Sequence, residues 1–140
     1  LTTVEACDGV IDGSVKAIVS LGGNLLRAVP DPLRVEPAWR RLPLTVQILT
    51  KLNRSAVIHG EAAWLLPCLG RIEIDRQAGV EQAVSMEDST GAMHGSRGQA
   101  EPASPQLLSE PAIVAGIAKA LLARSVGSDP EDVERFLSGK

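Results

Sequence analysis

The stretch Val15-Lys16-Ala17-Ile18-Val19-Ser20-Leu21-Gly22-Gly23-Asn24 joins an apolar run to a pair of glycines. A short apolar run of this kind is typical of a buried strand in a parallel sheet, here predicted over 15–21. Gly22 and Gly23 can adopt positive φ angles without a Cβ clash, so a tight loop is expected after the strand. In such a loop, backbone N–H groups and the Asn24 amide can meet a polyanion. An ordinary tight turn is the alternative and the commoner use of a glycine pair.

The next segments repeat the order of strand, polar loop and helix. Strands are predicted over 44–49 and 62–66, and Asp31-Pro32 is a typical helix start with proline at the first helical position. Strands that alternate with helices predict an α/β fold, here a Rossmann-like three-layer domain around a mostly parallel sheet. A length of 140 residues makes a single domain over 1–140 the default.

The other segments have weaker signals. Helices are predicted over 4–11, 33–41, 109–124 and 129–137. The first of these has capping-box spacing between Thr2 and Glu5. Gly, Ser, Pro and charged residues dominate from about 70 to 106, so a long irregular segment is expected there. Its only strand candidate is 82–86.

Composition argues against several classes of function. With 14 Lys and Arg against 17 Asp and Glu, the net charge of -3 gives no overall attraction to nucleic acid or to an anionic membrane. Two Trp, one Phe and no Tyr make stacking on exposed bases unexpected. No apolar run approaches the roughly 20 residues that span a bilayer, and no signal peptide opens the sequence. A cytoplasmic protein is therefore expected.

The cysteines and histidines lack metal-ligand spacing. Cys7 and Cys68 are far apart, so no zinc site or iron–sulfur cluster is predicted, and both thiols are expected to be reduced and buried. His59 and His94 are expected to have surface or capping roles. No metal-binding residue is predicted.

Two loops form the candidate ligand site. Ligands of open α/β sheets bind outside the carboxyl ends of the strands, so the loop 22–24 and the segment 50–55 are expected to face one crevice. The second segment supplies cations, hydroxyls and an amide: Thr50, Lys51, Asn53, Arg54 and Ser55. Such groups suit a diphosphate or a nucleotide. The alternative is that the cations are solvated and Asn53 only caps a helix. A third loop, which combines 87–89 with 94–97, is either a cover over a ligand or plain solvated chain.

A series of motifs runs along the chain: Leu21-Gly22-Gly23-Asn24, Thr50-Lys51-Leu52-Asn53-Arg54-Ser55, Leu65-Leu66-Pro67-Cys68-Leu69-Gly70-Arg71 followed by Glu73 and Asp75, Glu87-Asp88-Ser89, and Ser109-Glu110-Pro111-Ala112-Ile113. In this order they are similar to the large subunit of molybdopterin-dependent oxidoreductases, in the branch described as formate dehydrogenase alpha subunit-like. The resemblance covers about 15–124, and its specificity lies in the series rather than in any one motif.

The resemblance implies a large enzyme whose molybdenum is held by two molybdopterin guanine dinucleotides, one of them bound by the domain over 1–140. Gly22, Gly23 and Asn24 would contact the phosphate or pterin region of that dinucleotide. The guanosine end would contact the residues named above from the second loop, Thr50, Lys51, Asn53, Arg54 and Ser55. This sequence has neither the proline that many relatives place after the asparagine nor their acidic residue after the second strand. Thr50, Asn53 or a residue elsewhere must then accept the guanine N–H groups.

The comparison also shows what this sequence lacks. It has no counterpart of the cysteine or selenocysteine that ligates molybdenum, no cluster-binding motif and no second cofactor domain. We therefore expect a segment that binds part of a cofactor and is not catalytic alone. Its start at Leu1 rather than Met favours a piece of a longer enzyme, whose other domains would be its partners. A separated piece would expose an apolar face and self-associate. The alternatives are a non-catalytic nucleotide-binding module and a structural domain.

Overall fold

The computed structural model describes residues 2–122, which form two compact units that divide after Pro67. The helix predicted over 129–137 lies outside the described residues. None of the helices within 2–122 has the length and apolar character needed to span a membrane.

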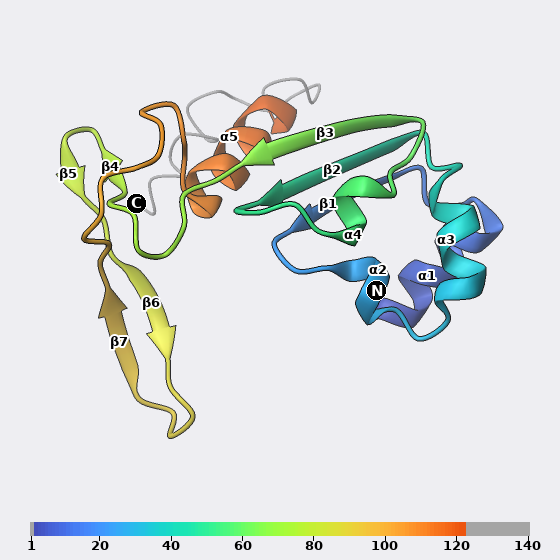
Figure 1. The fold of residues 1–140 in the computed structure, drawn as a ribbon, viewed down its shortest axis with the longest axis horizontal. Helices are drawn as coiled ribbons and strands as arrows, with labels where there is room; N and C mark the ends of the chain where they lie inside the picture. The colour runs from blue at the N-terminus through green and yellow to red at the C-terminus, as the bar shows by residue number, and fades with distance from the viewer. Residues whose placement is uncertain (1, 123–140) are drawn as a thin grey trace. The chain divides into compact units, whose positions relative to one another are not determined.

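The first unit is built around a three-stranded parallel sheet (Figure 1). Its elements in order are α1 (Thr3–Asp12), β1 (Ala17–Leu21), α2 (Leu25–Ala28), α3 (Pro32–Trp39), β2 (Leu44–Leu49), α4 (Arg54–Val57) and β3 (Ala62–Pro67). The strands follow the order β1-β2-β3, so consecutive strands are neighbours and each is joined to the next by helical segments. The α/β fold with a parallel sheet and all three predicted strands are confirmed. The prediction that the first strand is buried was wrong, because every residue of β1 is exposed or only partly buried. The short helix α2 was not predicted, because four residues are too few to show a periodicity.

Local chemistry explains where these elements begin and end. Both hydrogen bonds of the predicted capping box between Thr2 and Glu5 are present at the start of α1. Gly13 ends that helix in the left-handed conformation, with φ of 79°. Pro32 opens α3, and the helix ends at Trp39, two residues before its predicted end, with Pro37 inside it.

The core of the first unit lies between the helices and the sheet. Its buried side chains are Cys7, Val10, Leu26, Val29, Val35, Ala38, Trp39, Leu42 and Ile58. Ile18 of β1 packs against this cluster, whereas its neighbour Val19 is 54% exposed, because successive strand residues point to opposite faces. Trp64 of β3 is in register with Val19 through the central strand and is 64% exposed. The expected apolar face is thus present, and self-association through it stays a prediction.

The second unit contains two antiparallel hairpins and a helix. Its elements are β4 (Arg76–Gln77), β5 (Val80–Glu81), β6 (Val84–Glu87), β7 (Met93–Ser96) and α5 (Glu110–Leu122). The prediction of an irregular segment with one strand candidate was therefore wrong in part. The first hairpin turns at Ala78 and Gly79, both at positive φ. Asn-Gly or Asp-Gly is the usual signal for such a turn, so the turn could not be predicted from the Ala-Gly pair.

Helix α5 begins directly after Ser109, as predicted. The Ser109 carbonyl accepts the Ile113 N–H at 3.0 Å. Earlier in this unit, the Glu73 carboxylate joins two loops, since its oxygens accept the N–H groups of Gly70 at 2.6 Å and Ala103 at 2.7 Å. These hydrogen bonds lower the pKa of Glu73, so this carboxylate is a charged structural link.

Candidate functional site

The two predicted loops lie against each other at the carboxyl ends of β1 and β2. Gly22 and Gly23 have φ angles of 62° and 67°, the left-handed values that glycine permits without strain. The Gly22 N–H donates to the Ile48 carbonyl at 2.8 Å, and the Asn53 Nδ2 donates to the Gly23 carbonyl at 2.7 Å. The predicted meeting of the two loops is confirmed.

Ser55 and Asn24 form a second connection between the loops. The Asn24 Oδ1 accepts hydrogen bonds from the Ser55 hydroxyl at 3.1 Å and from the Ser55 N–H at 3.3 Å. The Ser55 Oγ in turn accepts the Leu26 N–H at 3.0 Å. Ser55 is completely buried, so its hydrogen bonds hold the glycine loop in place from the interior of the unit. Asn24 precedes α2 but does not cap it with its side chain.

The two cations of the second loop differ in their surroundings. The Arg54 guanidinium pairs with the Glu36 carboxylate at 2.6 Å, and Arg40 approaches the same carboxylate at 3.6 Å. Lys51 and Thr50 are exposed and have no hydrogen-bond or ion-pair partner among residues 2–122. Lys51 is thus the cation that could reach a ligand without losing an internal contact.

The backbone groups that are free to bind a ligand at this site are hydrogen-bond donors. Within the described part of the chain, the N–H groups of Gly23 and Asn24 have no acceptor. A Cβ added to Gly23 would meet no atom within 4 Å, so the space over this residue is open. Free N–H donors, with an exposed lysine in the neighbouring loop, fit a phosphate or diphosphate group. They do not supply the acceptors that a guanine ring requires.

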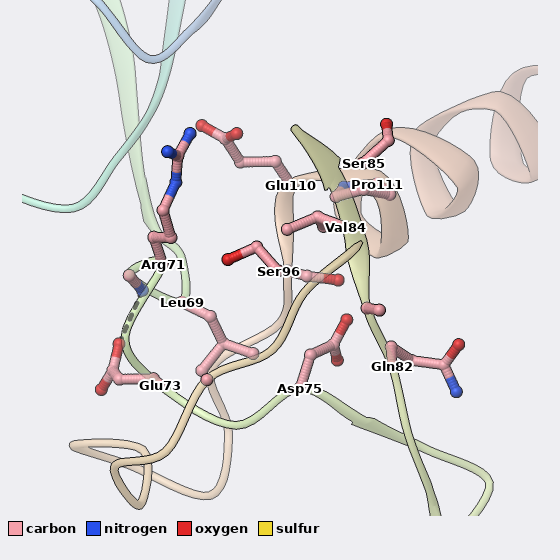
Figure 2. Close-up of a pocket in the computed structure, with 14 residues that line it drawn as sticks. Leu69, Arg71, Glu73, Asp75, Gln82, Val84, Ser85, Ser96, Glu110 and Pro111 are labelled. Carbon is pink, nitrogen blue, oxygen red and sulfur yellow. Dashed lines mark hydrogen bonds between the residues drawn. The ribbon is translucent and has the colours of Figure 1, made fainter. Parts of the chain in front are cut away.

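A cavity of about 540 Å³ in the second unit was not singled out from the sequence. Leu69, Asp75, Ser85 and Ser96 are among the residues that line it, and Figure 2 shows Arg71 and Glu110 extending toward the same side. Glu73 also borders it, but its carboxylate is bound to the Gly70 N–H. The only sequence signal for this cavity was that several of these residues belong to the motifs that carry the family resemblance.

The β6–β7 hairpin unites the segments 87–89 and 94–97, which the sequence treated as one loop. Asp88 organises the turn: its Oδ1 accepts the Thr90 hydroxyl at 2.6 Å and the N–H groups of Thr90 and Ala92. Its Oδ2 lies 2.9 Å from the His94 Nε2. These hydrogen bonds, that from the Thr90 hydroxyl first, hold the pKa of Asp88 far below its usual range.

The amides of the β6–β7 turn are therefore expected to lose protection from hydrogen exchange in acid. A carboxylate whose pKa is lowered by folding contributes stability above its unfolded pKa of about 4, and that contribution fades as the pH falls below this value. The protection factors of the Thr90 and Ala92 amides, which are the ratios of the intrinsic to the observed exchange rate, should fall as the pH is lowered from 7 to 3 in NMR measurements. Asp88→Asn should expose both amides already at pH 7 and remove the dependence on pH. Equal protection in the variant would show that the charge on Asp88 does not hold the turn.

The cysteines and histidines behave as predicted. Cys7 and Cys68 are free and buried, and burial raises the pKa of both thiols, which keeps them protonated. The His59 Nδ1 lies 2.6 Å from the Gly60 carbonyl and His94 belongs to the hairpin turn. Residues 2–122 contain no group of three or more potential ligands that could hold a metal ion.

The chain is similar in sequence to segments of longer known proteins. The chain is 46% identical over 119 residues to the uncharacterized oxidoreductase Rv2900c of Mycobacterium tuberculosis, covering 85% of this chain and 15% of that protein. It is similar to one segment of much longer oxidoreductases. The same values hold for the uncharacterized oxidoreductase Mb2924c of Mycobacterium bovis. Protein YdeP of Escherichia coli K12 is 42% identical over 123 residues, which make up 88% of this chain and 16% of YdeP. No family model matches the chain.

Proposed function

We propose that this chain is the dinucleotide-binding segment of a molybdopterin-dependent oxidoreductase of the formate dehydrogenase alpha subunit-like kind. In this proposal, the loops 22–24 and 50–55 hold one molybdopterin guanine dinucleotide. The observation that carries the proposal is the hydrogen-bonded meeting of these loops at the ends of neighbouring parallel strands. The oxidoreductase names of the relatives support the reaction class.

The residues of the site fit the phosphate groups of such a cofactor. The N–H groups of Gly23 and Asn24 would donate to phosphate oxygens, and the Lys51 ammonium would balance their charge. Arg54 would act from its pair with Glu36. When bound, the cofactor supplies two-electron transfer at molybdenum, while the protein supplies position and electrostatics. The segment itself would not be catalytic, and the other domains of a longer cytoplasmic enzyme would be its partners.

Two other functions have support of their own. A non-catalytic nucleotide-binding module would bind the phosphate groups of a nucleotide with the same two loops. A structural domain that packs against partners is favoured by the exposed apolar side chains of the sheet, Val19, Leu21 and Trp64. Cofactor content separates these functions from the first, because neither of them requires molybdenum.

The experiment is to measure molybdenum and released GMP in the purified longer protein, with and without Lys51→Gln. Losing one exposed charge-assisted contact, worth about 1.5–3 kcal/mol, should reduce the content of both at least about tenfold when cofactor is limiting. Lys51 has no hydrogen-bond or ion-pair partner within residues 2–122, so the fold of this part should be unaffected. Lys16→Gln is the control for the loss of a lysine charge away from the site: Lys16 lies before the opposite end of β1, where its ammonium donates to the Gly13 carbonyl, and the content should stay unchanged. A longer protein without molybdenum, or equal loading of both variants, would refute the proposal.

A further inference from the structure

We infer that Asn24, Asn53 and Ser55 are positioning residues, and that the two loops they join, 22–24 and 50–55, bind a diphosphate without distinguishing the attached base. This inference rests on the proposed function and refines it. The family resemblance had implied that Asn53 and Ser55 contact the guanosine end of the ligand. Their hydrogen bonds argue for a different role.

All but one of the polar atoms of these three side chains are hydrogen-bonded within residues 2–122; the exception is the Asn24 Nδ2. The Asn24 Oδ1 accepts two hydrogen bonds from Ser55, one from its hydroxyl and one from its N–H. An amide oxygen has two lone pairs, so this acceptor is used up. The Ser55 hydroxyl both donates and accepts, and its residue has no exposed surface. A ligand could not reach it without opening the loop.

Asn53 is engaged at both ends of its amide. Its Oδ1 accepts the Ala56 N–H at 3.2 Å, and its Nδ2 donates to the Gly23 carbonyl at 2.7 Å. The second of these bonds links Asn53 to the glycine that lies at φ of 67°. Asn53 therefore holds the glycine loop in the conformation that leaves the Gly23 and Asn24 N–H groups unpaired within the described residues.

Within the described residues, the loops 22–24 and 50–55 also contain no carboxylate that could select guanine. Guanine presents neighbouring N–H donors, and a carboxylate is the usual partner for such a pair. The carboxylate of Glu36 is already shared between Arg54 and Arg40. Among residues 2–122, the groups of the two loops that remain unpaired are the N–H groups of Gly23 and Asn24, the Asn24 Nδ2, the Lys51 ammonium and the Thr50 hydroxyl. These groups recognise negative oxygen atoms, which every nucleoside diphosphate carries.

The test uses the 140-residue chain with three probes: inorganic pyrophosphate, ADP and GDP. NMR titration followed at the Gly23 amide should give affinities that agree within about threefold. GDP binding more than tenfold tighter than ADP would overturn the inference and still support a nucleotide site. If none of the three probes binds, both the inference and the proposal that these two loops bind a dinucleotide are overturned.

The Ser55→Ala variant tests whether Ser55 positions the glycine loop or contacts the base of the ligand. Ser55→Ala removes a buried hydroxyl, and we expect it to weaken all three probes by the same factor of about five, because the glycine loop loses its support. The ratio of GDP to pyrophosphate affinity should not change. Ser14→Ala, at an exposed position before β1, is the control and should bind as the parent does. If Ser55→Ala fails to fold, Asn53→Ala replaces it. A selective loss of GDP binding in either variant would show that the altered side chain contacts the base.

Discussion

Trp39→Ala is expected to lower the free energy of unfolding of the first unit by about 3–5 kcal/mol. Trp39 is 1% exposed and is the largest fully buried side chain among the described residues. It comes from α3 and belongs to the cluster shared with α1 and α2, so its removal leaves a cavity where three helices meet. Its Nε1 has no acceptor among residues 2–122, and losing this unsatisfied donor offsets part of the cost. The lower half of the range is therefore expected.

The measurement is urea unfolding followed by hydrogen exchange of the β1 and β2 amides, which reports on the first unit alone. Trp64→Ala is the matched control, because the same truncation is made at a side chain that is 64% exposed. Its effect should stay below about 1 kcal/mol. Equal losses in the two variants would mean that Trp39 does not lie in the core.

Gly98→Ala should destabilise the second unit by about 3 kcal/mol, the upper end of the usual cost of overpacking. A Cβ at this position would lie 1.9 Å from the Glu73 carbonyl oxygen and 2.2 Å from its carbonyl carbon. Both atoms are backbone, so neither can rotate away as a side chain would, and the chain itself must shift. The shift would disturb the loop whose Glu73 carboxylate joins Gly70 to Ala103. Hydrogen exchange at the Gly70 and Ala103 amides should accelerate first.

Gly116→Ala supplies the control within the same unit. A Cβ added there meets no atom within 4 Å, and the residue lies inside α5. Alanine should stabilise this helix by up to about 1 kcal/mol, since it forms helix more readily than glycine. Unchanged exchange at Gly70 and Ala103 in Gly98→Ala would show that the backbone there adapts without cost.

The sequence predicted the first unit well because its signals are local. The apolar run of β2 gave both strand boundaries, Leu44 and Leu49, as a central strand of a parallel sheet should. The capping box predicted the start of α1, and the two glycines predicted the left-handed loop. In the second unit, β4 and β5 have two residues each, too few to show alternation, and their turn lacks the usual residues. The β4–β5 hairpin was missed for that reason, whereas β6 overlaps the predicted strand candidate 82–86.

The sequence alone determined which polar residues stand at the ends of two neighbouring strands, and so where a ligand would be sought. Only the tertiary structure decided which of their atoms are still free. Asn24 and Ser55 are 31 positions apart, and Glu36 lies 18 positions before Arg54, yet each pair is in contact. A hydrogen bond uses up a lone pair or a proton whichever part of the chain provides the partner. Residue type therefore fixes what a side chain can bind, and the fold fixes whether that capacity remains for a ligand.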